Sequence, residues 1–314
     1  MPAQFEPLPR HRPFRVGFLQ APGEKQLPDL TLKISVPWLA GVATEEIFAD
    51  LQPSGSSAGV SLYRSDNLLV GYASEPFVGA NLSGQAQRLY ERVIASSQGR
   101  HLYRIWNYVP RINELTAGLE NYRAFCRGRS VAFETSFGGA FQQKLSSASA
   151  VGSDGNSLET IFVAGESVPV HVENPEQTPA YQYPIEYGPR SPSFSRATTV
   201  KAGNREWVFV SGTAAIKGHV TVAPGTLLEQ VDCTLDNLRL VSLASGVGES
   251  LGASDGWQRH FKVYLRNPKH LAATADALQR SLLQPTDRVT YLKSDICRAA
   301  LDVEIEATLV RPQK

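Results

Sequence analysis

The amino-acid sequence predicts an α+β fold in which strands pair on one face and helices pack on the other. Segments with the two-residue alternation of strands are interspersed with amphipathic segments of helical period. A strand–proline–helix joint also occurs twice, as LYRIWNYVPRIN (102–113) and FKVYLRNPKHL (261–271). Each joint follows an amphipathic helix at a similar distance, which indicates a divergent internal duplication. We therefore expect two units of similar topology, with mixed sheets packed against helices.

The first half is expected to open with strands and to continue with two helices. Apolar residues recur every three to four positions in 80–97, which is typical of an amphipathic helix. The aromatic segment before Pro110 is typical of a strand, and the proline ends it. The strands are predicted at 14–19, 59–63 and 101–109, and the helices at 80–97 and 113–126.

Residues 146–165 allow two interpretations. Their serine and glycine content is compatible with a linker. However, two β-prone runs flank Ser-Asp-Gly-Asn at 153–156, which is a strong turn signal. We predict a β-hairpin here.

The second half repeats the alternation of strands and helices. Leu228, Val231, Leu235 and Leu238 recur on one face of a helix. A proline begins the next helix in its first turn. The strands are predicted at 206–212, 258–265, 288–292 and 300–309, and the helices at 227–243 and 268–282.

Composition limits the partners and the compartment. The 31 basic and 30 acidic side chains give a net charge of +1, which argues against nucleic acid or an anionic membrane as a partner. Three cysteines with no C-x-x-C spacing argue against a disulfide framework and favour a reducing compartment. Residues 1–15 hold no apolar run, so we expect no signal peptide and a cytoplasmic protein.

The last predicted strand carries the most informative pattern. Asp302, Glu304 and Glu306 alternate with apolar residues and therefore share one strand face. On an open sheet they form a solvated surface. If they line a cleft, burial and like charge raise the pKa of at least one of them and create a general acid.

Several other residues are candidates for a pocket. Cys297 precedes the carboxylate strand, where it is either a small buried apolar residue or a proton relay. Gly212 ends a strand, where it makes either a turn or a pocket floor. The irregular segment 181–196, with Tyr187 and Arg196, is either a packed arm or a ligand-lining loop.

Arginines near the ends of strands and helices can bind a dicarboxylate bidentately. Arg266 follows a strand, and Arg123, Arg127 and Arg129 cluster near the predicted end of a helix, where they could equally complement its dipole. The six histidines have no paired metal spacing, and we find no phosphate-binding loop and no G-x-S-x-G elbow. We therefore predict no metal and no cofactor.

Two family resemblances follow from these motifs. YGPRSPSFSRA, WVFVSGTAAI and VEIEATLVR resemble a RidA/YjgF-type domain over about 181–314. LYRIWNYVPRIN, GLENYRAFCRGR, AVGSDGNSL and YLKSDICRAALDVEIE together resemble the chorismatases, including the FkbO-like enzymes and the 3-hydroxybenzoate synthases, over nearly the whole chain.

The chorismatase resemblance implies a particular organisation. It implies a degenerate RidA-like domain at 1–180, a RidA/YjgF-like (chorismate-mutase-like) catalytic domain at 181–314, and an active site in the cleft between them. Imine deaminases of the RidA type carry an arginine fifteen residues before the glutamate that aligns with Glu304. Position 289 is valine here, with Arg288 beside it, which weakens the imine-deaminase alternative.

The same resemblance implies roles for residues. Glu304 matches the essential acid–base glutamate, and Cys297 and Gly212 match the pattern of members that release 3-hydroxybenzoate and pyruvate from chorismate. Members that form a dihydroxycyclohexadienoate carry alanine at the position of Gly212. The expected substrate contacts are Arg266, Arg129, Arg123, Tyr187, Arg196, Gly212 and Ala214.

The resemblance implies a cofactor-free reaction. Glu304 protonates the enol-pyruvyl ether, arginines bind the substrate carboxylates, and Cys297 assists the proton movements of aromatisation. Other possibilities are 4-hydroxybenzoate or a dihydroxycyclohexadienoate as product, an imine deaminase, and a non-catalytic metabolite-binding protein. A monomer or a small homo-oligomer is expected.

Overall fold

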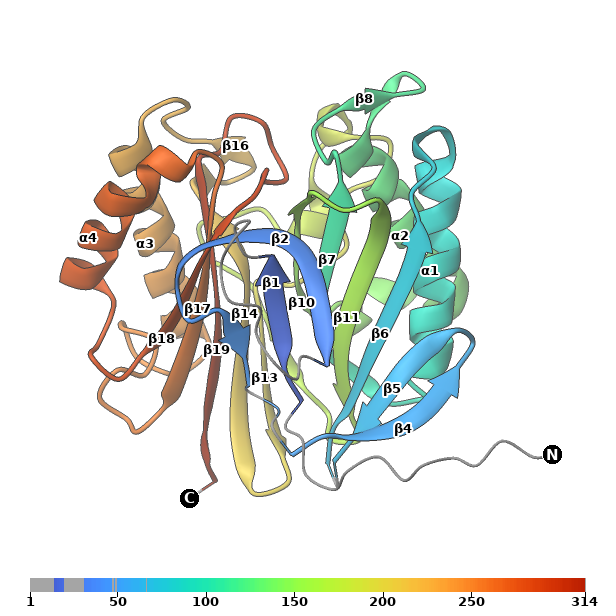
Figure 1. The fold of residues 1–314 in the computed structure, drawn as a ribbon, viewed down its shortest axis with the longest axis horizontal. Helices are drawn as coiled ribbons and strands as arrows, with labels where there is room; N and C mark the ends of the chain where they lie inside the picture. Colours follow the sequence, from blue (N-terminus) through green and yellow to red (C-terminus); the bar gives the residue numbers. More distant parts are fainter. Residues whose placement is uncertain (1–13, 20–30, 47, 49, 66, 314) are drawn as a thin grey trace.

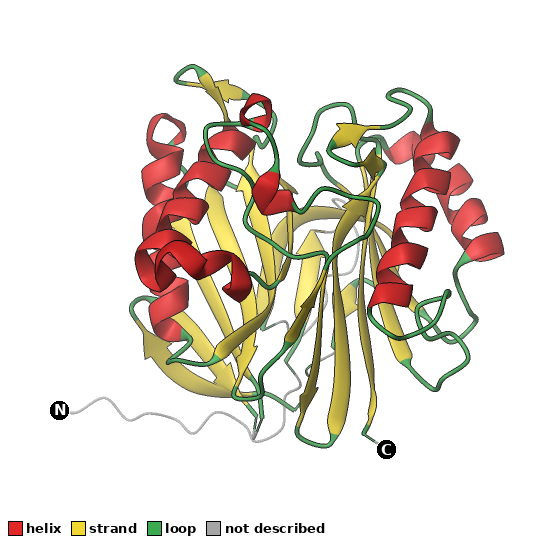
Figure 2. Ribbon diagram, turned by 180° about the vertical axis from the view of Figure 1, so that it is seen from behind, coloured by secondary structure: helices red, strands yellow, loops and turns green. Residues whose placement is uncertain are grey.

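The computed structural model describes residues 14–19, 31–46, 48, 50–65 and 67–313. Two sheets face each other in the middle of the molecule, and helices cover the outer side of each (Figures 1 and 2). This arrangement confirms the predicted α+β class. The expectation about a signal peptide concerns residues 1–15, of which 1–13 lie outside the described ranges.

The first sheet has six strands in the order β10-β7-β11-β6-β5-β4. Helices α1 (Leu82–Ser96) and α2 (Asn121–Phe137) pack on its outer face, and their apolar sides form one core with the sheet. The strands are β4 (Gln52–Ser57), β5 (Val60–Arg64), β6 (Leu69–Pro76), β7 (His101–Pro110), β10 (Ser147–Ser153) and β11 (Ser157–Gly165).

The second sheet has nine strands in the order β12-β13-β14-β19-β17-β18-β2-β1-β3. Helices α3 (Leu227–Ala244) and α4 (Leu271–Ser281) cover its outer face. The strands are β1 (Val16–Leu19), β2 (Leu32–Gly41), β3 (Thr44–Glu45), β12 (Val170–Val172), β13 (Ala197–Ala202), β14 (Arg205–Ala214), β17 (Gln258–Leu265), β18 (Arg288–Lys293) and β19 (Val303–Pro312).

The predicted helices at 80–97, 227–243 and 268–282 are confirmed, with the last beginning as a short 3₁₀ turn. The helix predicted at 113–126 is wrong at its start. Residues 115–120 instead form a small hairpin of β8 (Leu115–Thr116) and β9 (Leu119–Glu120). Ala117 and Gly118 both have positive φ, as the two central residues of such a hairpin require. Helix α2 therefore begins at Asn121.

The hairpin predicted at 146–165 is wrong in its pairing, although both of its strands exist. Strand β7 lies between β10 and β11 and pairs with both, parallel to β10 and antiparallel to β11. The turn at 154–156 therefore crosses the end of β7. The turn signal showed that the chain reverses direction, but it carried no information about a strand inserted between the two arms.

The predicted division of the chain at residue 180 stays a prediction. The second sheet contains strands from both ends of the chain, because β2 pairs with β18 and brings β1 and β3 with it. A third apolar core lies between the sheets and includes Trp106 from the first sheet and Phe18 and Phe209 from the second. Among the helices in the described ranges, none has the length and apolar character required to cross a membrane.

A buried ion cluster joins the two sheets at their centre. Glu306 on β19 accepts hydrogen bonds from Arg104 Nη2 at 2.7 Å and Trp106 Nε1 at 2.7 Å, both on β7. Lys262 Nζ on the neighbouring strand β17 lies 2.7 Å from the same carboxylate. The Ser149 hydroxyl on β10 donates a further bond. Because all four donors hold one anion, the cluster fixes how the sheets sit relative to each other.

Replacing Arg104 by methionine should destabilise the fold strongly. The substitution leaves the buried Glu306 carboxylate with one cation instead of two, and breaking a buried ion pair costs about 3–5 kcal/mol. Urea denaturation measures the loss. The matched control is Lys201→Met, which breaks a pair between Glu206 and an exposed lysine and should cost at most about 1 kcal/mol. Equal losses in the two variants would contradict the role given to the cluster.

Candidate active site

Glu304 and Glu306 project from the same face of β19 and are both almost fully buried. Their surroundings differ completely. Glu306 has two cations and two neutral donors around it, and Lys262 and Arg104 hold its pKa down to about 2 in spite of burial. It is therefore a fixed negative charge. Asp302, predicted to share this face, precedes β19 and instead lies beside Gln230 and His270.

Glu304 has no such partners among the described residues. Its side chain is 3% exposed, and its Oε1 is buried without a hydrogen-bond partner. Burial, followed by the negative charge of Glu306, raises its pKa to about 8. Glu304 therefore carries its proton at neutral pH, as a general acid requires. The interpretation of the three carboxylates as a solvated sheet surface is excluded for this residue.

Gly212 gives the Glu304 carboxyl its space. Strand β14 pairs with β19, and its register shifts between Val210 and Thr213. A Cβ atom at position 212 would lie 2.0 Å from Glu304 Oε1. The Gly212 N–H donates to Ser149 Oγ at 3.0 Å, so the same serine contacts both Gly212 and Glu306. Glycine thus lets the Glu304 carboxyl lie against the backbone here, whereas an added side chain would displace that carboxyl.

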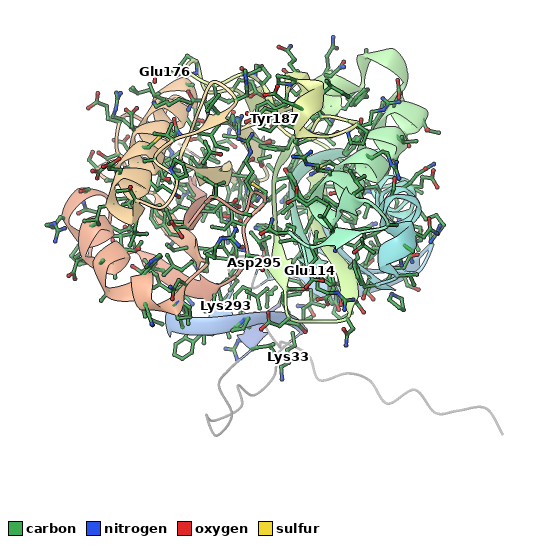
Figure 3. The ribbon with its side chains drawn as sticks, turned by 90° about the horizontal axis from the view of Figure 1, so that it is seen from above. Lys33, Glu114, Glu176, Tyr187, Lys293 and Asp295 are labelled. Carbon is green, nitrogen blue, oxygen red and sulfur yellow. The ribbon has the colours of Figure 1, made fainter. Side chains whose placement is uncertain are left out.

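A cavity of about 440 Å³ opens in front of Glu304, Gly212 and Cys297. One half of the molecule is the first sheet with α1 and α2, and the other half is the second sheet with α3 and α4. The cavity lies between these two halves, because its walls come from α2, from the segment 177–196, from β14 and from the loop 297–300. A smaller pocket of about 30 Å³ shares these three residues and extends inward to Arg129. In Figure 3, Tyr187, which lines the cavity, lies between the two halves.

Three arginines at this cavity keep unused donors among the described residues. Arg129 at the inner end is 3% exposed, and neither its Nε nor its Nη2 has a partner. Arg298 stacks on Tyr187 at 4.2 Å and leaves Nη2 unpaired. Arg196 donates to the Tyr183 hydroxyl, and its Nε makes no hydrogen bond but lies 3.9 Å from Glu173 Oε2. Buried guanidinium donors without partners favour an anionic ligand.

The predicted site residues divide into two groups. Glu304, Cys297, Arg123, Tyr187, Arg196, Gly212 and Ala214 all line the main cavity, and Arg129 lines its inner pocket. Arg123 is partly neutralised by Glu120 at 3.1 Å.

The arginines 123, 127 and 129 lie in the first half of α2 rather than at its end, so the helix-dipole alternative is wrong.

Arg266 does not line the cavity. Its guanidinium pairs with Asp295 at 2.5 Å and donates to the carbonyl oxygens of Leu301 and Arg298. These bonds hold the loop that carries Cys297. The structure therefore gives Arg266 the geometry of a positioning residue.

Cys297 faces the cavity as a neutral thiol. Burial, followed by the negative charge that Glu304 carries once it is deprotonated at high pH, raises its pKa well above the ordinary value of a cysteine. A thiol of this kind is a weak nucleophile, because the thiolate is the reactive form. It can donate a hydrogen bond and shape the wall beside Glu304.

Sequence reasoning missed the partners of Glu306. Arg104 and Lys262 stand within the apolar strands LYRIWNYV and FKVYL, where a lone cation is unusual. That contradiction was the available signal. The signal does not identify Glu306 as the partner, because the positions of β7 across from β19 and of β17 beside it are set by tertiary structure. Among the described residues, no group of three or more His, Cys, Asp or Glu side chains is placed to bind a metal ion.

Comparison with known proteins agrees with this geometry. Residues 49–164 match the family described as "Chorismatase FkbO/Hyg5-like, N-terminal". A 3-hydroxybenzoate synthase of Streptomyces hygroscopicus is 39% identical over 67% of this chain and 63% of its own length. A chorismatase of the same species is 36% identical over 81% of this chain and 75% of its own length.

One solved structure gives the same result for the whole fold. A crystal structure of a chorismatase matches with a TM-score of 0.78 and 28% identity, covering 95% of this chain and 93% of that one. RidA from a Psychrobacter species matches 45% of this chain at a TM-score of 0.32 and 19% identity. The two-sheet fold and its buried acid define an enzyme with a central cavity. The chain belongs to the chorismatase family.

The close approach at Gly212 predicts a coupled effect of two substitutions. Gly212→Ala should destabilise the protein by about 1–3 kcal/mol, because the new methyl group overlaps the Glu304 carboxyl. In a Glu304→Ala background the same substitution should cost much less, since the overlapping group is gone. Urea denaturation of the four proteins measures the coupling.

The control for this cycle is Gly139→Ala, where the added Cβ meets no atom within 4 Å. Its effect should be small in both backgrounds. Additive losses for Gly212→Ala and Glu304→Ala would show that the two positions do not compete for the same space.

Proposed function

We propose that this chorismatase converts chorismate to 3-hydroxybenzoate and pyruvate, with Glu304 as the proton donor. The observation that carries the proposal is a protonated, buried carboxyl with an unpartnered oxygen at the wall of an arginine-lined cavity. The relative named 3-hydroxybenzoate synthase supports the choice of product. Gly212 and Cys297 support it as well, because they match the pattern that the resemblance implies for that product.

Chorismate carries two carboxylates, so binding requires cations in the cavity. Arg129 at the inner end and Arg298 farther out offer guanidinium nitrogens without hydrogen-bond partners among the described residues, and Arg196 lies in the same cavity wall. Two carboxylates held at separate points fix the ring and the enol ether relative to Glu304. Such positioning contributes much of the rate in reactions of bound substrates.

The first chemical step is transfer of the Glu304 proton to the methylene carbon of the enol ether. The resulting cationic centre forms beside the new Glu304 carboxylate, which stabilises it. The neighbouring ring hydroxyl then displaces the ether oxygen internally, and pyruvate leaves. The bond from the hydroxyl oxygen to its original ring carbon then breaks, and loss of the proton on the carbon that now carries this oxygen makes the ring aromatic.

The proton balance of this route closes within the site. One proton moves from Glu304 to pyruvate, and one is released when the ring becomes aromatic. Glu304 can accept the second proton and return to its starting state. Chorismate and the two products balance in atoms without water, a metal or a redox cofactor. Cys297, as a neutral thiol beside the acid, assists this proton movement.

Glu304→Gln should retain the fold and lower pyruvate release by about two orders of magnitude or more. Glutamine resembles the protonated acid in size and charge but cannot donate its proton to carbon. Pyruvate formation from chorismate measures the rate, and the unfolding midpoint checks the fold. The matched control Glu166→Gln changes an exposed glutamate and should leave turnover unchanged. Near-normal turnover in Glu304→Gln would exclude this residue as the acid.

Cys297→Ala should shift the products away from 3-hydroxybenzoate while pyruvate is still released. The thiol acts after the ether has been protonated, so its loss should alter the fate of the ring more than the first step. Chromatography of the aromatic and diene products measures the shift. Cys233→Ala is the control, because Cys233 does not line the cavity. An unchanged product ratio would remove Cys297 from the mechanism.

A further inference from the structure

A second cavity lies at the other end of the sheet face that carries Glu304. Its volume is about 630 Å³, and it shares no lining residue with the Glu304 cavity. Thr308, Val310 and Pro312 continue the alternation of Glu304 and Glu306 along β19. Thr308 is four residues beyond Glu304, which is about 13 Å along a strand. Glu306 and Lys262 fill the interior between the two cavities.

Charge in this second cavity is dominated by arginine. Four of its lining residues are Arg205, Arg259, Arg288 and Arg311, whereas Glu46 is its single acidic one. His260, also in the wall, is neutral, because burial and then Lys262 lower its pKa to about 3. The cavity therefore presents more positive than negative charge, even before the ion pairs are considered.

Two of these arginines already have partners. Arg259 forms a two-point pair with Asp287, at 2.9 and 2.5 Å. Arg311 pairs with Glu206 at 2.7 Å. Glu46 is itself paired with Arg15 at 2.9 Å. Each of these three pairs is close to neutral.

Arg205 and Arg288 are different. Within the described ranges neither forms an ion pair or a side-chain hydrogen bond, and both are exposed. They leave two positive charges at the rim of a concave site. Guanidinium groups in such a position bind carboxylates bidentately.

The sheet register fixes how far apart these two arginines are. Arg205 is opposite Pro312, and Arg288 is opposite His260, which is itself opposite Thr308. The two positions are thus three strands apart and offset by four residues, about 14 Å across and about 13 Å along the sheet. One small monovalent ion cannot contact both, whereas a ligand with two or more separated acid groups can.

We propose that this cavity is a second ligand site, for a small polycarboxylate anion held between Arg205 and Arg288. The site is separate from the Glu304 cavity and does not depend on which product the enzyme forms. Thr286, Thr308 and Gln258 supply neutral hydrogen-bonding groups to such a ligand, and Val310 and Pro312 supply an apolar wall.

Calorimetry with citrate tests the proposal on the whole protein. We expect saturable binding of citrate at one site, and no saturable binding of acetate at the same concentrations, because acetate has a single acid group. Arg205→Gln/Arg288→Gln should weaken citrate binding at least tenfold. Added salt should weaken it as well, since both arginines are exposed.

The control variant is Arg88→Gln/Arg280→Gln, which removes two positive charges from exposed positions outside both cavities. It should bind citrate as the unmodified protein does. The Arg205/Arg288 variant should keep an unchanged KM for chorismate, because neither residue lines the Glu304 cavity. Absence of citrate binding, equal binding in the two double variants, or competition between citrate and chorismate would overturn the proposal.

Discussion

The structure depends on one buried carboxylate that holds its negative charge. Glu306 receives donors from two strands of the first sheet and faces a lysine of the second, so its ionisation and the contact between the sheets support each other. Burying an ion is costly unless it is fully paired, and here four groups pair with the Glu306 carboxylate. The central cavity exists between the halves because this cluster fixes their separation on one side of it.

The same carboxylate explains the state of its neighbour. Glu304 and Glu306 are two residues apart on one face of one strand, yet one is neutral and the other is charged at neutral pH. The difference arises from their partners rather than from their depth, since both are buried. A second negative charge beside Glu306 would be unfavourable, so Glu304 stays protonated at neutral pH.

Much of this could be predicted from the sequence, and what could not has a common cause. Local periodicity predicted the α+β class and most helices, and the alternation of β19 predicted that Glu304 and Glu306 share a face. The insertion of β7 between β10 and β11, the hairpin before α2 and the donors to Glu306 were missed. The donors and the inserted strand are set by contacts between segments distant in the chain, which a pattern in one segment does not encode. The hairpin was missed because Ala117 does not signal a positive φ.

The most direct test of the account is an infrared titration of the Glu304 carboxyl. The carbonyl stretch of a protonated carboxylic acid is followed as pH rises, and the band missing from Glu304→Gln is assigned to Glu304. The account predicts that this band disappears with a midpoint near pH 8, and at lower pH when Glu306 is replaced by glutamine. A midpoint near 4.5, the ordinary value for glutamate, would contradict the claim that burial and Glu306 keep this acid protonated.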